Sequence, residues 1–366
     1  MRIHISIYDS LKNPYYSGGG AHSTHEIAKF LSRNHKVTII CGAHGHSENR
    51  IIDGVFYKYI GPKWAGPKLG QFLFSMLLPI YALKENFDIW LENFQAPHST
   101  GFIPLFTKKP VIGITTTLHA EDFAKKYKIP FHFIERMGIK TYQHLIVLNQ
   151  SLERKIRFFN KKADIKIIPP AIEKEIFKIK NNNGVHVLFI GRLDIYQKGL
   201  DLLIKIWSEV VKDNKVKLII AGSGTSQELK KIDELIRQNK LENYVTLVGR
   251  VDGKKKQELF SKTLIGLSPS RFESFGIVAL EFMAAGKPFV CFDIEGFEWI
   301  PQSKALKIRS FNTNKFAQRI VEFLNDQKLR QEIGKKGKTF AQTFSFENIS
   351  KQYESYVLEV GRNYGI

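Results

Sequence analysis

Several features that mark particular protein classes are scarce in this sequence of 366 residues. Its two cysteines, Cys41 and Cys291, are far apart and have no neighbours at metal-ligand spacing, which excludes a disulfide framework and a cysteine-based metal site. The longest apolar run, residues 72–83, is interrupted by Ser75 and Pro79 and is too short for a membrane span. The start of the chain has a strand pattern without a signal peptide's apolar region. We therefore expect a cytoplasmic protein.

Short motifs of nucleotide and metal binding are missing as well. Residues 17–23 read Ser-Gly-Gly-Gly-Ala-His-Ser, which fits neither G-x-G-x-x-G nor a phosphate loop ending in Gly-Lys-Ser/Thr. There is no Asp-x-Asp metal motif, and we expect the nearest string, residues 293–295, to be a surface turn. The missing G-x-G-x-x-G motif argues against a nicotinamide-dependent oxidoreductase, and the missing Asp-x-Asp motif leads us to expect no metal site.

Acidic residues are outnumbered by basic ones, with 35 Asp and Glu against 55 Lys and Arg, so the formal net charge is +20. The excess is spread along the chain and forms no basic tail, so we expect no nucleic-acid partner. A basic surface favours polyanions, among them anionic lipid headgroups. A generally lysine-rich composition is the ordinary alternative explanation.

Short apolar runs alternate with helical patterns along the chain. This alternation is typical of α/β folds with parallel sheets covered on both faces. The predicted strands are 2–8, 37–41, 56–60, 89–91, 111–115, 145–148, 165–168, 185–190, 216–221, 245–248, 264–267 and 289–292; the predicted helices include 24–32, 69–84, 200–211, 226–238, 255–260, 315–324, 329–340 and 346–360. Two doubly wound domains, 1–170 and 185–345, are therefore expected. Pro169-Pro170 precede the linker between them, 171–184, and Asn181-Asn182-Asn183-Gly184 end it.

The stretch 268–288 reads as a strand end, a turn, a helix and a glycine stop. Glu273 lies in the turn, and Glu281 follows eight residues later, about two helical turns on. We expect the amides of Phe275 and Gly276 at the helix start, where free N–H groups favour an anion. An ordinary capped helix with an acidic first turn explains this stretch equally well when it is taken alone.

Loops after other strands belong to the same predicted sheet edge, where open α/β sheets bind ligands. Gly191, Arg192 and Lys198 follow the strand at 185–190 and combine a guanidinium fork with a point charge, which suits a diphosphate. Further candidates at this edge are Ser223, Arg250 and Val251, which can line a nucleoside pocket.

The first domain offers two weaker candidates. Gly18, Gly19 and Gly20 precede a predicted helix and let backbone amides approach a phosphate closely, although a flexible turn is as good an explanation. His119 follows the fifth strand beside hydroxyls and acids, but a lone histidine is more often structural than catalytic.

The string from Glu273 to Glu281, with Gly191-Arg192 and Lys198-Gly199 upstream, resembles the retaining nucleotide-sugar glycosyltransferases often called group 1. The resemblance covers nearly the whole chain. It implies the GT-B fold, with two Rossmann-like domains facing across a cleft. It further implies that 1–170 is the acceptor side, that 185–345 binds the nucleotide sugar, and that a C-terminal helix, 346–366, crosses back to the first domain.

The resemblance also implies roles for single residues. Arg192 and Lys198 would hold the donor diphosphate, Glu281 the ribose, and Glu273 and His119 would lie beside the reacting sugar. Contacts to sugar, phosphate or nucleoside are implied for Gly18, Gly19, Gly20, Gly191, Ser223, Arg250, Val251, Ser274, Phe275 and Gly276. Ser274 and the string Gly296-Phe297-Glu298 depart from the usual family residues. The resemblance therefore does not define the detailed contacts to the donor sugar.

The implied reaction moves a hexose-type sugar with retention, and without metal or cofactor, from a UDP or GDP donor to a glycan, lipid-linked or other hydroxyl acceptor. A same-face route and a double displacement with Glu273 as nucleophile both stay open. So do a sugar phosphorylase or synthase on this fold, a nicotinamide-dependent oxidoreductase and a non-catalytic binder. The +20 charge and the apolar stretch 69–83 add the prediction of peripheral attachment to an anionic inner membrane surface.

Overall fold

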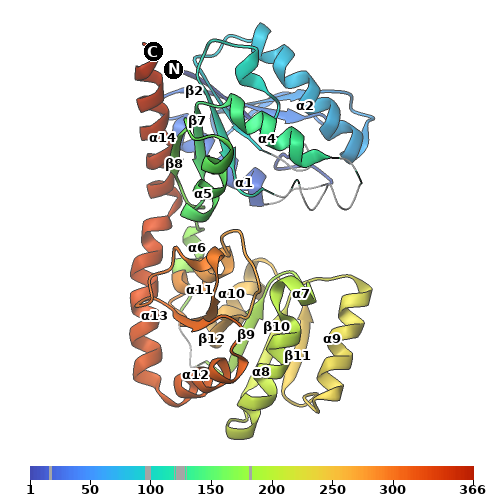
Figure 1. Ribbon diagram of the computed structural model, residues 1–366, viewed down its shortest axis with the longest axis vertical. Coiled ribbons are helices and arrows are strands. Elements are labelled where there is room, and N and C mark those ends of the chain that lie inside the picture. Colours follow the sequence, from blue (N-terminus) through green and yellow to red (C-terminus); the bar gives the residue numbers. More distant parts are fainter. Residues whose placement is uncertain (16–18, 95–99, 119, 121–127, 129, 181–183) are drawn as a thin grey trace. The chain divides into compact units, whose positions relative to one another are not determined.

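The computed structural model describes residues 1–15, 19–94, 100–118, 120, 128, 130–180 and 184–366 (Figure 1). The chain divides into two units, Met1–Ala171 with Phe346–Ile366, and Ile172–Ser345. Gly18 and His119, two of the predicted site residues, lie outside the described residues. Each unit is an α/β structure built on one sheet.

The sheet of the first unit has the order β3-β4-β2-β1-β5-β6-β7-β8. Its strands are β1 (Arg2–Ser6), β2 (Lys36–Gly42), β3 (Arg50–Ile52), β4 (Val55–Ile60), β5 (Ile89–Asn93), β6 (Val111–Thr115), β7 (His144–Val147) and β8 (Asp164–Ile167). All pairs are parallel except β3 with β4, which the expectation of purely parallel strands missed. The turn between them, Asp53-Gly54, has positive φ at both residues (49° and 81°) and fits a two-residue hairpin.

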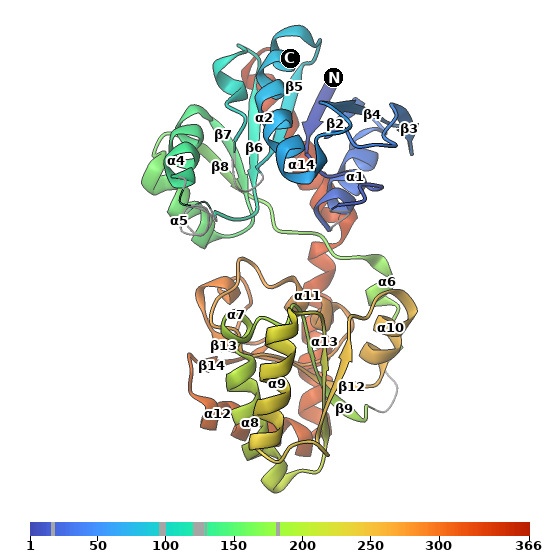
Figure 2. The same ribbon diagram turned by 90° about the vertical axis from the view of Figure 1, so that its right-hand side faces the viewer.

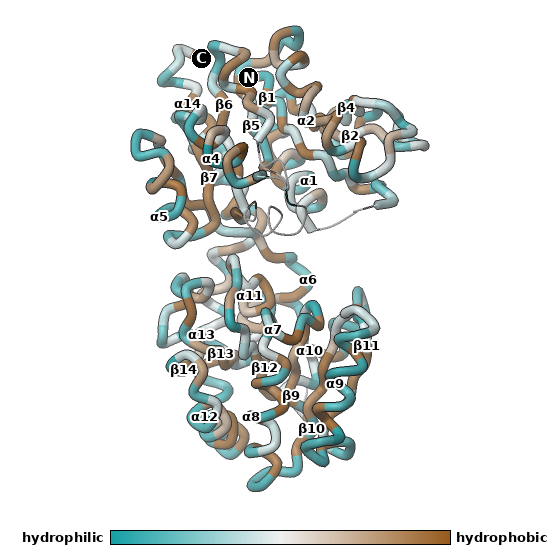
Figure 3. Tube along the Cα trace, turned by 45° about the vertical axis from the view of Figure 1, so that its right-hand side comes forward, coloured by the Kyte–Doolittle hydropathy of each residue, from teal (hydrophilic) through white to brown (hydrophobic). Residues whose placement is uncertain are grey.

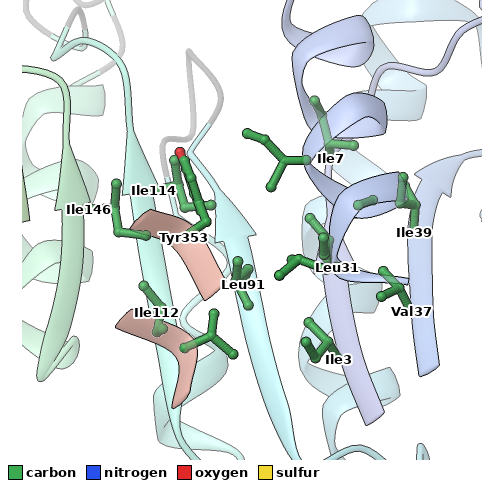
Figure 4. Close-up of a cluster of buried hydrophobic side chains, with 14 of the residues drawn as sticks. Ile3, Ile7, Leu31, Val37, Ile39, Leu91, Ile112, Ile114, Ile146 and Tyr353 are labelled. Atoms are coloured by element: carbon green, nitrogen blue, oxygen red, sulfur yellow. The ribbon is translucent and has the colours of Figure 1, made fainter. Parts of the chain in front are cut away.

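Helices cover both faces of this sheet. They are α1 (Gly19–Leu31), α2 (Gly66–Lys84), α4 (Phe131–Thr141), α5 (Gln150–Phe159) and α14 (Phe346–Asn363), with a short 3-10 helix η1 (Ile103–Leu105). Strand alternation divides the core: Leu91 packs with α1 and α14, whereas its neighbour Trp90 packs with α2, α4 and α5. Tyr353 of α14 lies beside Ile114 of β6 (Figure 4) and shares a core cluster with Ile112, so the C-terminal helix completes the first unit.

The sheet of the second unit is parallel throughout, with the order β11-β10-β9-β12-β13-β14. Its strands are β9 (His186–Ile190), β10 (Lys217–Ala221), β11 (Val245–Gly249), β12 (Thr263–Ser268), β13 (Phe289–Asp293) and β14 (Leu306–Arg309). Its helices are α6 (Lys174–Phe177), α7 (Ile195–Lys198), α8 (Leu200–Asp213), α9 (Ser226–Gln238), α10 (Gly253–Ser261), α11 (Ile277–Ala284), α12 (Thr313–Asn325) and α13 (Gln327–Ala341), with 3-10 turns η2 (Glu295–Phe297) and η3 (Gln342–Phe344). Figure 2 shows α8 and α9 side by side, and they are in contact.

Part of the segment predicted as a linker, 171–184, packs with the second unit. The backbone N–H of Ile172 donates to the carbonyl oxygen of Phe344 at 2.8 Å. The carbonyl oxygen of Phe177 in α6 accepts from Lys338 Nζ at 2.7 Å. Among the described residues, no helix is both long enough and apolar enough to cross a bilayer.

Glu92 is a buried carboxyl near the end of β5, with 2% of its surface exposed. Burial raises its pKa to about 7, while hydrogen bonds from the Tyr142 hydroxyl and the Gly101 backbone N–H oppose the rise. The unfolded chain would ionise Glu92 near its ordinary pKa of 4.5. Between these two values the unfolded state has lost the proton that the folded state keeps, so stability falls as pH rises.

Replacing this carboxyl by an amide tests the effect. We expect E92Q to abolish a loss of roughly 2–3 kcal/mol that the wild-type first unit undergoes between pH 5 and 8. Glutamine keeps an acceptor for Gly101 and gains a donor for Tyr142 without a titrating proton. Hydrogen exchange of β5 and β6 peptides across this pH range measures the difference. The exposed E48Q is the control and should follow the wild type; parallel pH profiles for E92Q and wild type would contradict the assignment.

Candidate active site

The candidate site is built on the carboxyl ends of β9 and β12, which are neighbours in the second sheet. After β9 the chain enters the one-turn helix α7, which Asp194 caps by accepting from the Gln197 backbone N–H at 2.8 Å. Gly199 ends that turn in the left-handed conformation, with φ 64°, and starts α8. The sequence therefore places Lys198 on a short, rigid corner.

The loops after β9 and β12 are fastened to each other. The backbone N–H of Arg271 donates to the carbonyl oxygen of Gln197 at 2.9 Å, and its guanidinium holds both carboxylate oxygens of Asp201 at 2.8 and 2.6 Å. A Cβ on Gly199 would come within 2.1 Å of the carbonyl oxygen of Pro269, so only glycine lets the loops approach this closely. Sequence reasoning missed Arg271 and Asp201.

Lys198 and Glu273 meet where these loops touch. Lys198 Nζ lies 2.7 and 2.9 Å from the two carboxylate oxygens of Glu273. Their side chains are only 16% and 9% exposed, so each charge needs the other as a partner. The hydroxyl of Ser270 donates to Glu273 Oε1 at 2.8 Å, a contact that sequence reasoning did not find.

A second lysine–glutamate pair lies on the neighbouring helices. Lys256 Nζ of α10 is 2.7 Å from Glu281 Oε1 of α11. Both side chains are partly buried, at 27% and 15% exposure. The sequence singles out Glu281 by its spacing from Glu273, but Lys256 stands in a run of three lysines and carries no mark of its own.

The helix after β12 begins later than predicted. It starts at Ile277, so Glu273, Phe275 and Gly276 all lie in the loop before it. Glu273 thus lies in the turn, as predicted, but the expected spacing of two helical turns between Glu273 and Glu281 is wrong, because the helix does not reach back to Glu273. Gly276 adopts φ 72°, where a Cβ would lie 2.2 Å from the Phe297 ring. Phe275 is buried by stacking on Trp299, with ring centroids 4.3 Å apart.

Other predicted residues of the second unit lie at the strand ends without joining the Lys198–Glu273 pair. Arg192 is exposed and donates to the side chain of Gln197. The end of β10 packs closely on that of β9, because a Cβ on Gly222 would lie 1.7 Å from the carbonyl oxygen of Gly191. Ser223, Ser274 and Arg250 are exposed, Val251 is half-buried, and Arg250 pairs with Asp252 at 2.9 Å.

The first unit's glycines lie differently from the prediction. Gly19 and Gly20 form the first turn of α1 rather than a loop before it. No described atom lies within 4 Å of a Cβ placed on Gly19, so its surroundings leave room for close approach to the backbone. Among the described residues, no cluster of histidine, cysteine or acidic side chains is arranged to hold a metal ion.

Comparison with known proteins decides the class. Residues 171–340 match the family model described as glycosyl transferases group 1, and residues 17–176 match that of glycosyltransferase family 4. The chain is a glycosyltransferase with the GT-B fold. The first match covers nearly all of the second unit, which carries both lysine–glutamate pairs.

Individual relatives are distant. The glycosyltransferase is 23% identical to the N-acetyl-alpha-D-glucosaminyl L-malate synthase of Bacillus anthracis, over 99% of this chain and 98% of that protein. It is 29% identical to an uncharacterised glycosyltransferase, MJ1607, of Methanocaldococcus jannaschii, over 60% of this chain and 61% of that one. It resembles Anabaena Alr3699/HepE, solved in complex with UDP and glucose, with 16% identity, a TM-score of 0.74, and coverage of 98% of this chain and 100% of that one.

Alanine at Gly199 tests the fastening of the two loops. We expect G199A to destabilise the second unit by about 1–2 kcal/mol for the left-handed backbone and by a further 1–3 kcal/mol for the overlap with Pro269. The matched control is G249A, because Gly249 also has positive φ (68°) but open space around its Cβ. Urea unfolding measures both variants, and equal losses would show that the close approach contributes nothing.

Proposed function

We propose that this glycosyltransferase moves a hexose-type sugar, with retention, from a UDP or GDP donor to a hydroxyl acceptor. The observation that carries the proposal is the ion pair of Lys198 and Glu273, which joins the loops after β9 and β12. It sets a cation and a carboxylate side by side at a sheet edge where α/β folds bind nucleotides. UDP in the structurally similar Anabaena protein supports a nucleotide donor.

Arg192 and Lys198 are the groups we assign to the diphosphate. Among described residues, Lys198 Nζ bonds only to Glu273, through two of its three donors, and one donor stays available. Among the described residues, Arg192 donates to the neutral side chain of Gln197 and pairs with no carboxylate, so no described group neutralises its charge. Negative charge grows on the departing nucleoside diphosphate, and fixed cations stabilise it without a metal ion.

Glu281 is the group we assign to the ribose. Its Oε1 is held by Lys256, and within the described structure its Oε2 forms no hydrogen bond. A carboxylate oxygen with free lone pairs is a suitable acceptor for a sugar hydroxyl. Lys256 meanwhile offsets a negative charge that would otherwise repel the diphosphate.

Retention by the same-face route agrees best with the surroundings of Glu273. Its carboxylate accepts two hydrogen bonds from Lys198 and one from Ser270. Such bonds stabilise the carboxylate and weaken it as a nucleophile. In the same-face route the leaving phosphate takes the acceptor proton, and Glu273 orients the sugar.

Single alanine substitutions test the donor site. We expect K198A and R192A each to lower transfer about 100-fold or more, because each removes a fixed positive charge beside the leaving group. The assay incubates the protein with UDP-glucose, UDP-N-acetylglucosamine and GDP-mannose, and measures released nucleotide by mass spectrometry, with and without EDTA.

The matched control is R237A, which removes an exposed arginine on α9 and should act like wild type. Wild-type rates in both K198A and R192A would overturn the donor assignment. Release of neither UDP nor GDP by the wild type from any donor would overturn the proposed function, and EDTA sensitivity would overturn metal independence.

We further propose a lipid-linked or envelope glycan acceptor and peripheral attachment to an anionic membrane. The support is α2, which is rich in apolar residues (Figure 3) and whose exposed positions are largely apolar as well. Those positions, three or four residues apart on one face, are Leu69, Phe72, Met76, Ile80 and Leu83. On α4, which packs on the same face of the sheet, Phe133 and Met137 are also exposed.

The charges around these helices favour binding to an anionic surface over pairing with a second copy of the chain. Lys63, Lys68, Lys84 and Lys140 are exposed there. The nearby acids are neutralised or hidden: Glu85 pairs with Lys58, and Glu135 is buried. Two such faces would repel each other, whereas anionic lipids attract lysines and accept apolar side chains.

Vesicle binding tests the attachment. We expect the wild type to co-sediment with vesicles that contain anionic lipid at low salt, and to dissociate at high salt because screening weakens the lysine contacts. M76E/L83E should bind at least 5-fold less. The control I51E/V185E adds the same charge at exposed apolar positions elsewhere and should bind like wild type. Absence of wild-type binding, or an equal loss in the control, would refute the attachment.

A further inference from the structure

A chain of buried hydroxyls lies behind Glu273. Ser268 is the last residue of β12, and Ser270 follows Pro269; they are 6% and 0% exposed. Their hydroxyl oxygens are 2.9 Å apart, and that of Ser270 is 2.8 Å from Glu273 Oε1. Ser268 has no role in the assignments above, and Ser270 appears there only as one of the donors that weaken Glu273 as a nucleophile.

Counting the hydroxyl protons shows which serine donates each hydrogen bond. A carboxylate paired with Lys198 only accepts hydrogen bonds, so the single hydroxyl proton of Ser270 must point to Glu273. The bond between the serines must then be donated by Ser268. Only Ser270 therefore donates to Glu273, and Ser268 contacts Ser270 but not the carboxylate.

The hydrogen bond from Ser270 makes the two oxygens of Glu273 unequal. Oε1 accepts from both Lys198 and Ser270, which uses its two lone pairs. Oε2 accepts only from Lys198 among the described residues, at the longer distance of 2.9 Å. One lone pair on Oε2 therefore remains for a ligand hydroxyl.

We propose that Ser270 is the positioning residue of the donor-sugar site. Resting on the proposed function, this assigns a hydroxyl of the transferred sugar to Oε2 of Glu273 and makes Ser270 fix the carboxylate for it. Without Ser270, the carboxylate of Glu273 can rotate about its Cγ–Cδ bond beside Lys198. Oε2 then no longer has a fixed position for the sugar hydroxyl. A correctly placed carboxylate oxygen affects the rate of sugar transfer more than the binding of the nucleotide, because it contacts the reacting sugar.

The backbone around Glu273 is already rigid, which confines the effect of Ser270 to the side chain. A Cβ on Gly296 would lie 2.3 Å from the Glu273 carbonyl oxygen, so η2 packs directly on this residue. Arg271 ties the same loop to Gln197 and Asp201. Loss of one hydroxyl leaves these contacts in place.

The experiment compares S270A with S268A. Both remove one buried hydroxyl of equal size two residues apart, but only S270A removes the bond to Glu273. We expect S270A to lower kcat 10-fold or more with donor KM and UDP affinity changed less than 3-fold. S268A should stay within 3-fold of wild type in all three quantities. Equal losses in both variants, or less than a 3-fold loss in S270A, would overturn the proposal.

A double-mutant cycle shows whether Ser270 acts through Glu273. In the E273Q background we expect S270A to lower the residual rate by less than 2-fold, since the group that it orients is already changed. A full additional 10-fold loss in S270A/E273Q would overturn the proposal, because it would give Ser270 an independent role.

Crystal structures of S270A and S268A separate this proposal from the proposed function. If the wild type transfers no sugar, the function fails, and the position of Glu273 still decides the role of Ser270. We expect the carboxylate to leave its present position in S270A and to keep it in S268A. An unmoved carboxylate in S270A would overturn the positioning role.

Discussion

The ion pair of Lys198 and Glu273 depends on how closely the loops after β9 and β12 approach. Two partly buried charges stabilise each other only when their geometry is held, because each has lost water. Three features hold it: the cap of α7 by Asp194, the left-handed Gly199 against Pro269, and the bidentate hold of Arg271 on Asp201. The candidate chemistry at this edge is therefore a consequence of backbone contacts that carry no chemistry themselves.

Much of the fold could be predicted because burial on both faces of a sheet requires short, continuous apolar runs. The prediction failed where that requirement is relaxed. β3, at the sheet edge, has only three residues, and Asp53-Gly54 was the available hairpin signal. α5 is not among the helices named from the sequence, although Asn149 marks its start as an N-cap that accepts from the Leu152 backbone N–H at 2.9 Å.

The candidate site was predictable in its residue types and less so in its contacts. Charged and small residues after consecutive strands single out Arg192, Lys198, Glu273 and Glu281, because parallel strands end at one edge. Sequence spacing does not tell which side chain meets which. In the sequence, nothing distinguishes Lys256, within its lysine run, or Ser270, three residues before Glu273, from an ordinary surface residue. The helix start was misplaced because Gly276 takes a left-handed conformation that glycine permits but does not require.

If the proposed function holds, the two lysine–glutamate pairs resolve a conflict that any nucleotide-sugar site faces. Carboxylates are good acceptors for ribose and sugar hydroxyls, yet they repel the diphosphate between those groups. Here each glutamate has a lysine at 2.7 Å, so the negative charge of each acceptor is offset. Arg192, which has no described carboxylate partner, then gives these five side chains a net positive charge. The site can thus attract a diphosphate and still present carboxylate oxygens to hydroxyls.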